Sequence, residues 1–310
     1  MIAAHTNALV VRGFTVFVAT RYDDVPAGCA RYVSVDGSVP GAALVWDHHV
    51  TGERINLDAM PARFDLSGFD GIGTTLADMD AVASVVAALH GGKAALPAQA
   101  RGVLEAASCW CDHLGPHPAH DAETNRLGRG LLDVVGERLA GPPDRASWRF
   151  ADACRLVDDA VRAGGPLPYA DRFAERVERA RKLFTEGRAR REGAVLVVDR
   201  RGWASIDPAA VLSLDDATVA VWVDDHKAGG PRYTVGLNPN ARLPVDDVRP
   251  ALTALAAAEF ARGAPALAPT PGTASENWGG RQAVFGSPWN YGSRLKPDEV
   301  VGIVRVALGV

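Results

Sequence analysis

Three separate segments of the chain carry side chains that could bind a divalent metal ion. The first is Asp47-His48-His49, which directly follows the apolar run Leu44-Val45-Trp46. The second is Asp78-Met79-Asp80, which begins an apolar stretch, and the third is Cys109-Trp110-Cys111-Asp112-His113, which ends another. Carboxylate oxygens and imidazole nitrogens are common ligands of divalent cations. An acid and two imidazoles at the end of a buried strand make a divalent-metal site the first hypothesis.

Length and composition limit what kind of protein this is. At 310 residues the chain is long enough for two domains, each with its own core. With 47% hydrophobic residues, 23% charged residues and a net charge of −4, it has no overall attraction to nucleic acids or anionic membranes. Its four irregularly spaced cysteines predict a reducing, cytoplasmic setting without a disulfide framework. We expect neither a signal peptide nor a membrane-spanning segment, because no run of about 18 apolar residues occurs.

The apolar pattern in the first half predicts a mainly parallel sheet flanked by helices. Strands rich in β-branched and aromatic residues are expected at 14–20 and 31–35, and 42–46 is expected to be a parallel strand buried on both faces. Helices are expected at 76–89, 97–107, 125–139 and 146–162. Asp36 lies at the end of the second expected strand.

The second half begins with a strongly charged segment. Residues 169–191 are predicted to form one long helix that bridges two domains. Strands are then expected at 194–198, 218–223 and 233–237, and helices at 248–261 and 297–308. A Pro- and Gly-rich loop at 265–275 leads into a stretch rich in glycine and aromatic residues at 276–293. The sequence therefore predicts two α/β domains, 1–168 and a smaller one at 193–310, joined by a helical linker at 169–192.

These motifs resemble the DHH phosphoesterase family, and the resemblance covers most of the chain. In that family a metal-binding α/β domain is joined to a smaller DHH-associated domain that binds substrate. Asp47-His48-His49 matches the signature triplet, and residues 106–112 resemble a later motif that supplies one aspartate ligand, Asp112. The resemblance implies a site in the cleft between the two domains.

The order of the motifs departs from the family. The family has a histidine and then Asp-x-Asp-Ala-x-x-Ser well before the triplet. Here Asp78-Met-Asp80-Ala-Val-Ala-Ser84 matches the core of that motif but follows the triplet and lacks the histidine. Either the ligands have moved to a neighbouring helix or the match is accidental, since aspartates in the first turn of a helix are favoured without any metal. The number of bound metal ions stays open.

A second motif lies near the C-terminus. Residues 279–283, Gly-Gly-Arg-Gln-Ala, resemble the glycine-rich substrate motif, where the family has Gly-Gly-His-Pro-Ala-Ala-Gly. The resemblance implies that Asn277, Gly279, Gly280 and Arg281 bind substrate. An arginine can hold a terminal phosphate through two hydrogen bonds, while glycines expose backbone N–H groups to the same anion. A tight turn with Arg281 in solvent is the alternative.

The chemistry that the resemblance implies is phosphoester hydrolysis by metal-activated water. Two divalent ions about 3.5 to 4 Å apart need no covalent nucleophile for this reaction. The expected metal ligands are His48, Asp78, Asp80, Asp112 and Asp36, and the expected catalytic residues are His49 and Asp47. Mn²⁺ accepts mixed oxygen and nitrogen ligands and is the expected ion, in one or two copies, with Mg²⁺ as the alternative.

A zinc site is not expected. Cys109 and Cys111 lack a second pair of cysteines. Alternation along an extended segment would also place Cys111 and Asp112 on opposite faces, so that this segment cannot direct all its side chains at one ion.

The sequence thus predicts a hydrolase whose substrate is a small nucleotide or short oligonucleotide. Two alternatives stay open: a catalytically weakened relative that binds a phosphorylated ligand, and an enzyme of specialised metabolism that uses the same site on a non-nucleotide substrate. A long nucleic acid is not an expected partner, because the chain has no basic excess. A homodimer and a hinge at the charged segment are also left open.

Overall fold

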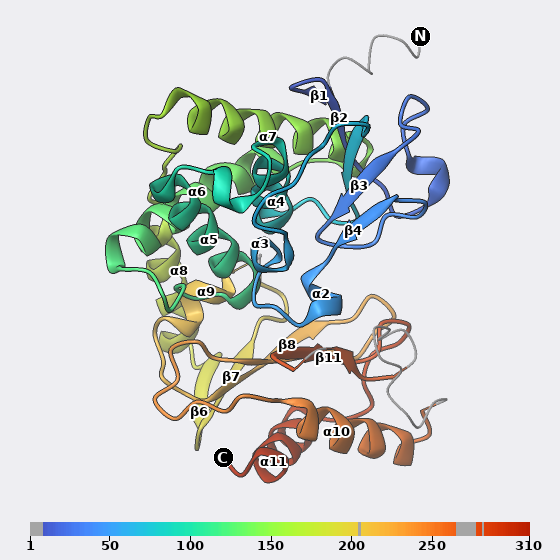
Figure 1. Cartoon of the computed structure of the whole chain (residues 1–310). Helices are drawn as coiled ribbons and strands as arrows, with labels where there is room; N and C mark the ends of the chain where they lie inside the picture. Colours follow the sequence, from blue (N-terminus) through green and yellow to red (C-terminus); the bar gives the residue numbers. More distant parts are fainter. Residues whose placement is uncertain (1–8, 204–205, 265–276, 281) are drawn as a thin grey trace. The chain divides into compact units, whose positions relative to one another are not determined.

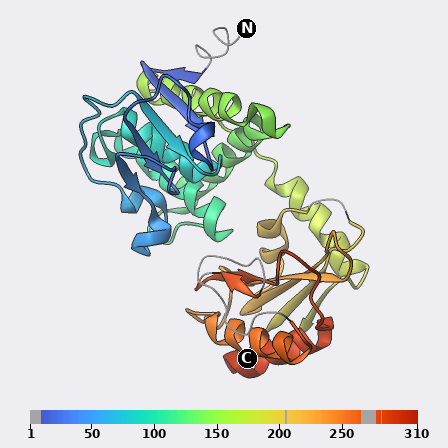
Figure 2. The ribbon, with the colours of Figure 1, turned by 90° about the vertical axis from the view of Figure 1, so that its right-hand side faces the viewer.

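The structure is a computed structural model, and it describes residues 9–203, 206–264, 277–280 and 282–310. The chain divides into two compact units, Met1–Arg172 and Phe173–Val310 (Figures 1 and 2). Each unit combines helices with one sheet and has its own apolar core. The predicted fold class, two α/β units, is confirmed.

The first unit contains a five-stranded sheet with the strand order β1-β2-β5-β3-β4. Its strands are β1 (Val10–Val11), β2 (Phe14–Val18), β3 (Tyr32–Val35), β4 (Leu44–Trp46) and β5 (Gly71–Thr74). Strands β2, β5, β3 and β4 are parallel, and β1 is antiparallel to β2. Val16, Val33 and Ile72 are fully buried along neighbouring strands, as expected for a parallel sheet.

Helices α4 (Met79–Leu89) and α7 (Ala146–Ala163) pack against this sheet, and α5 (Ala98–His113) and α6 (Ala122–Leu139) pack against these two helices (Figure 1). The unit also contains the short helices α2 (His48–Thr51) and α3 (Asn56–Ala59) and 3-10 turns at Tyr22–Asp24, Lys93–Ala95 and Pro143–Arg145. Every residue of α4 is buried, because this helix packs against the sheet and against α5 and α7. A smaller cluster of Phe17, Ala19, Tyr32 and Val39 is packed by loop residues Val25, Cys29 and Ala42.

Two strands of the first unit differ from the sequence prediction. The strand β4 was expected to be buried on both faces, but it lies at the edge of the sheet and Val45 is 41% exposed. The pattern also gave no sign of β5, which lies in the middle. Gly71 and Gly73 leave room for the ring of Phe17, since a Cβ on Gly73 would lie 2.7 Å from Phe17 Cε2. Glycine has a low strand propensity, which hides such a strand in the sequence.

The second unit contains a six-stranded sheet with the order β10-β11-β9-β8-β7-β6. Its elements are α8 (Phe173–Thr185), β6 (Ala189–Glu192), β7 (Val195–Asp199), α9 (Pro208–Leu212), β8 (Val219–Asp225), β9 (Pro231–Leu237), α10 (Arg249–Ala261), β10 (Gly279–Gly280), β11 (Val284–Gly286) and α11 (Pro297–Leu308). Only β7 and β8 pair in parallel among these described strands. The core joins Val221 and Tyr233 of the sheet to Leu255 of α10 and Val304 of α11.

The prediction of a single helix over 169–191 is wrong. Helix α8 ends at Thr185, and Ala189–Glu192 form the strand β6, which pairs with β7. Gly187, with φ +69°, separates the two elements. Alternating charge suggested one helix, but Arg190 and Arg191 are instead exposed residues of an edge strand. Helix α8 packs against α9 and belongs to the second unit.

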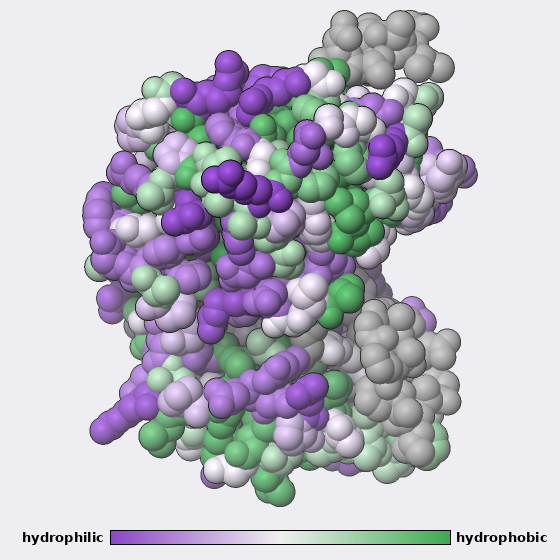
Figure 3. Space-filling model, viewed as in Figure 1, coloured by the Kyte–Doolittle hydropathy of each residue, from purple (hydrophilic) through white to green (hydrophobic). Residues whose placement is uncertain are grey.

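The surface shown in Figure 3 is largely hydrophilic, with apolar side chains interspersed. Large apolar residues such as Val50 (79%) and Trp148 (47%) are exposed, and exposed apolar side chains are normal on a protein surface. Among the described residues, no helix combines the length and the apolar character needed to cross a bilayer.

Candidate metal centre

The imidazole of His48 lies among three carboxylates. Its Nε2 atom is 3.1 Å from Asp112 Oδ2, 3.3 Å from Asp36 Oδ1 and 3.7 Å from Asp80 Oδ2. The other ring nitrogen, Nδ1, lies 3.2 Å from the backbone oxygen of Glu53. With Nδ1 directed at this oxygen, Nε2 faces the carboxylates, where a bound cation would take the place of its proton. His48 therefore has the orientation of a metal ligand.

Sheet topology brings Asp36 and Asp47 to the same edge. Val35 pairs with Trp46 in the parallel ladder of β3 and β4, so the residues that follow the two strands emerge side by side. Asp36 has a left-handed backbone, φ 49°, and its N–H donates to the Trp46 oxygen at 2.9 Å. Asp47 caps α2 by accepting from the His49 N–H at 2.9 Å. The carboxyl ends of parallel strands are a common place for binding sites in α/β proteins.

The displaced motif Asp78-Met79-Asp80 reaches this edge as well. It follows β5, which pairs in parallel with β3, and it begins α4. Asp78 caps the helix by accepting from Ala81 N–H at 2.9 Å, and Asp80 Oδ2 accepts from Asn56 N–H at 2.8 Å. The motif is out of order along the chain but lies beside Asp36 and His48 in space, because β5 is inserted between β2 and β3.

The predicted arrangement of the third segment is wrong. Residues 109–113 are not extended; they complete helix α5, which the sequence analysis ended at residue 107. The helix ends at His113, and the next residue, Leu114, has a left-handed backbone, φ 58°. Because α5 packs against α4, its last turn brings Asp112 next to His48. Helical geometry also lets Cys111 and Asp112 face one region, which alternation had excluded.

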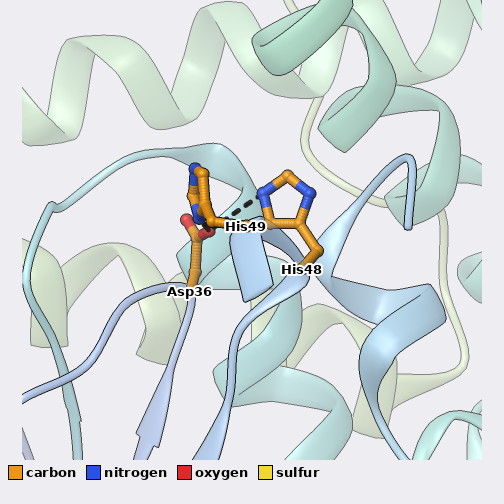
Figure 4. A group of neighbouring side chains, drawn as sticks. All are labelled: Asp36, His48 and His49. Carbon is orange, nitrogen blue, oxygen red and sulfur yellow. Dashed lines mark ion pairs between the residues drawn. The ribbon is translucent and has the colours of Figure 1, made fainter. Parts of the chain in front are cut away.

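His49 is held by Asp47 at the edge of the cluster. Its Nδ1 lies 2.6 Å from Asp47 Oδ1 and 3.7 Å from Asp36 Oδ1. Figure 4 shows the Asp36 carboxylate close to the rings of His48 and His49. The His49 side chain is 34% exposed, whereas that of His48 is 3% exposed. His49 is therefore the more solvent-accessible of the two imidazoles.

The electrostatics of the cluster favour a cation. Burial lowers the pKa of His48, but the nearby carboxylates of Asp112, Asp36 and Asp80 outweigh burial and raise the pKa to about 11. Burial, followed by the charges of Asp112 and Asp36, raises the pKa of Asp80 to about 8. Asp36 Oδ1, His48 Nε2 and Asp80 Oδ1 are buried without a hydrogen-bond partner in the described part of the chain. A divalent cation would satisfy these atoms and relieve the repulsion.

The donor atoms fit a cation of the expected kind. Asp36, His48 and His49 form one group, and His48, Asp80 and Asp112 form another, each with ligand atoms within 4.8 Å of one another. Oxygen donors with one or two imidazoles suit Mn²⁺, and oxygen donors also suit Mg²⁺. The assignment of these residues as metal ligands stays a prediction that their proximity supports.

Asn56 is a residue of this site that the sequence analysis missed. It is fully buried at the start of α3; its Oδ1 accepts from His48 N–H at 3.0 Å, and its Nδ2 donates to Ser84 Oγ at 2.9 Å. Together with the bond from its own N–H to Asp80, it ties α2 to α4. Ser84, the last residue of the displaced motif, thus accepts a hydrogen bond from a residue that also contacts His48 and Asp80. Nothing in the local sequence around Asn56 signals this role.

Two neighbouring histidines, His113 of the third segment and His120 beyond it, belong to none of the metal-binding groups among the described residues. His113 Nε2 lies 2.7 Å from the backbone oxygen of Arg54, and His120 Nε2 lies 2.8 Å from Glu105 Oε2. Both imidazoles therefore have partners within the protein.

The candidate substrate residues belong to the second unit. Gly279 and Gly280 form β10 and pair with Gly286 and Phe285. Gly280 has φ +156°, and a Cβ there would lie 2.4 Å from Phe285 Cα, so the hairpin itself explains this glycine. Asn277 is buried and its Oδ1 accepts from Trp278 N–H at 2.8 Å. Arg281 lies outside the described residues.

Comparison with family models and with curated proteins finds no match. Among solved structures, the chain is similar to a pGpG-specific phosphodiesterase, PggH from Vibrio cholerae, with 14% sequence identity and a TM-score of 0.44. The match covers 92% of this chain and 86% of that chain.

Proposed function

We propose that this protein is a metal-dependent phosphoesterase related to the DHH family, which hydrolyses a small nucleotide or a short oligonucleotide. One observation carries the proposal. The Asp-x-Asp motif is displaced along the chain, yet Asp80 lies 3.7 Å from His48 of the Asp-His-His triplet, beside Asp36 and Asp112. An accidental sequence match would not be expected to place its carboxylate there.

The residues divide into two roles in this proposal. The ligands of one or two Mn²⁺ ions, or of Mg²⁺, are His48, Asp36, Asp78, Asp80 and Asp112. When bound, the cation supplies Lewis-acid polarisation of the phosphoester and activation of water. Asp47 orients His49 by bonding its Nδ1, which leaves Nε2 to contact a phosphate oxygen at the more exposed side of the cluster.

The second unit is proposed to bind the substrate through Asn277, Gly279, Gly280 and Arg281. Backbone N–H groups of the glycines and the arginine fork are suited to a phosphate group. This part of the proposal rests on the sequence resemblance, because the β10–β11 hairpin itself requires a glycine at position 280. A site in a cleft between the two units stays a prediction.

A ligand-binding protein without catalytic activity is the second candidate. Gln282 stands where the family has proline, and its Nε2 donates to the backbone oxygen of Asp246 at 2.8 Å, so this side chain is engaged by the protein itself. Such a protein would bind a phosphorylated ligand and release no product. A non-nucleotide phosphoester is the third candidate and differs from the first only in its substrate.

The test combines metal content with hydrolysis. The wild type, His48→Ala and Asp112→Ala would be loaded with Mn²⁺, desalted and assayed for bound metal and for hydrolysis of nucleotides, dinucleotides and base-free phosphoesters. Asp159→Ala is the matched control, because this acid lies on α7 with a 62% exposed side chain. We expect the two site variants to lose metal affinity and activity by more than about 100-fold and the control to lose neither.

The other outcomes separate the candidates. Wild type that retains no Mn²⁺ or Mg²⁺ would contradict the metal centre. Wild type that retains metal and binds a dinucleotide without hydrolysing it would favour the ligand-binding candidate. Activity on base-free phosphoesters equal to that on nucleotides would favour the third candidate, an enzyme that acts on a non-nucleotide phosphoester.

A further inference from the structure

A thiol lies within the acidic part of the metal centre. Cys111 Sγ, one carboxylate oxygen of Asp78 and one of Asp112 lie within 4.8 Å of one another, and all three residues are half-buried. Asp78 precedes α4, while Cys111 and Asp112 are adjacent in the last turn of α5. Two packed helices thus present one sulfur and two carboxylates to a common point.

The group around this thiol shares a carboxylate with the first metal cluster. Asp112 also belongs to the His48 group, since its Oδ2 lies 3.1 Å from His48 Nε2. The thiol group is therefore continuous with the first metal cluster and shares one carboxylate with it.

Atoms that lack partners occur in the same cluster. Asp80, whose side chain is 0% exposed, belongs with Asp112 to the neighbouring His48 group. Its Oδ1 has no hydrogen-bond partner within the described residues. A bound cation is one way to satisfy a buried carboxylate oxygen that has no hydrogen-bond donor.

We infer that Asp78, Cys111 and Asp112 form a thiolate-containing cation subsite, which binds borderline-soft divalent ions such as Zn²⁺ and Co²⁺ more tightly than Mn²⁺ or Mg²⁺. Thiolate ligands select zinc-like ions, whereas carboxylates alone suit Mn²⁺ and Mg²⁺. On binding, the thiol releases its proton to solvent and the sulfur bonds the ion. The inference rests on the metal centre of the proposed function, but not on the reaction.

Cys109 provides a matched comparison on the same helix. It is fully buried in the apolar core, and its Sγ lies 4.0 Å from Arg54 Nη1. It belongs to none of the metal-binding groups among the described residues. A Cys109→Ala variant therefore removes a sulfur close to the site without removing a proposed ligand.

The experiment uses the absorption of Co²⁺, which gains a near-ultraviolet charge-transfer band only when a thiolate binds it. Metal-free full-length protein, Cys111→Ser and Cys109→Ala would be titrated with Co²⁺ under reducing conditions, followed by Zn²⁺ and Mn²⁺ titrations. We expect the band in the wild type and in Cys109→Ala but not in Cys111→Ser. Zn²⁺ affinity should fall by about tenfold or more in Cys111→Ser, since even partners outside the ligand shell are worth about that much.

Each other result overturns the inference in a recognisable way. Stoichiometric Co²⁺ binding without the band, or with a band that persists in Cys111→Ser, would refute the subsite and leave the metal centre intact. No Co²⁺ binding at all would refute both. If Cys111→Ser does not fold, alkylation of the wild type with peptide mapping decides: Zn²⁺ must protect Cys111, and unprotected Cys111 in the zinc-loaded protein overturns the subsite.

Discussion

Asp80 shows how the site opposes the stability of the metal-free chain. Its carboxylate is fully buried near two other acids, and only one of its oxygens accepts a hydrogen bond, from Asn56 N–H. Burial and the charges of the neighbouring acids both disfavour the ionised carboxylate, which costs free energy of folding, and removal of the carboxyl group relieves that cost.

Asp80→Asn should stabilise the metal-free protein and abolish its response to Mn²⁺. An asparagine oxygen can still accept from Asn56 N–H, while the cost of burying a carboxyl group that must be ionised or take up a proton is removed. We expect the midpoint of thermal unfolding of the first unit to rise by about 2 to 4 °C without metal, which corresponds to about 1 kcal/mol. Calorimetry of wild type and variant, each with chelator and with Mn²⁺, measures this. A lower midpoint in the metal-free variant would show that Asp80 is structural.

The stability of the metal-free protein should also fall as pH rises through neutrality. The pKa of Asp80 is raised to about 8, so the folded chain holds a proton that the unfolded chain has lost, and stability decreases from the ordinary carboxyl range up to about pH 8. The pKa of His48 is raised to about 11, so its contribution is complete below 6.5 and is lost as pH increases. Both groups therefore lower the stability of the metal-free protein as pH rises.

Thermal unfolding in chelator at about pH 6 and about pH 9 tests this dependence. We expect a lower midpoint at the higher pH, and a smaller difference for Asp80→Asn. A wild type that is more stable at the higher pH would contradict the assigned environments of Asp80 and His48.

At the scale of elements, the short helix α3 supports the site through a single side chain. Asn56 joins α3 to the backbone of His48 in α2 and to Ser84 in α4. Asn56→Ala would leave the His48 N–H and the Ser84 hydroxyl without these buried partners. We expect a loss of stability of about 1 to 3 kcal/mol and a loss of Mn²⁺ affinity of about 10- to 100-fold.

Denaturant unfolding and metal titration measure the two effects of Asn56→Ala, and Ser84→Ala is the control. Ser84→Ala removes only the partner of Asn56 Nδ2 and leaves the bond to His48 in place. It should therefore retain most of the Mn²⁺ affinity. Equal losses in the two variants would mean that the Asn56 bond to His48 does not position the ligand.

The sequence predicts elements well where side-chain period and composition agree. Helices α6, α7, α10 and α11 lie within a few residues of their expected bounds because their apolar residues recur with helical spacing. The strand β5 was missed because its Gly-Ile-Gly-Thr sequence carries almost no strand signal. Residues 109–113 were misjudged because a helix end and a short strand look alike over five residues.

Candidate site residues could likewise be named from the sequence where the local pattern is distinctive. Asp36, His48, Asp80 and Asp112 were all named from the sequence, since acids and imidazoles at the ends of apolar segments stand out. Their convergence could not be read from their order along the chain, because it depends on the insertion of β5 beside β3. Asn56 and the shared direction of Cys111 and Asp112 depend on tertiary packing, which a linear pattern does not contain.

At the scale of the whole molecule, the two units have separate cores. The first core consists of residues between Leu9 and Leu167, and the second of residues between Val195 and Val310. All proposed metal ligands belong to the first unit, and all proposed substrate residues belong to the second. The proposal therefore assigns metal binding and substrate affinity to different parts of the chain.

A truncated chain of residues 1–172 should fold and bind Mn²⁺ with the affinity of the full-length protein. The cut preserves the local contacts of Arg172, whose N–H donates to Asp133 Oδ2 at 3.2 Å and whose guanidinium pairs with Glu137. Since substrate affinity is assigned to the second unit, the truncated chain should hydrolyse the preferred nucleotide with a much higher KM. Circular dichroism, metal titration and steady-state kinetics measure these properties. A folded fragment that no longer binds Mn²⁺ would mean that the second unit completes the metal centre, and a fragment with unchanged KM would remove the substrate role of Asn277, Gly279, Gly280 and Arg281.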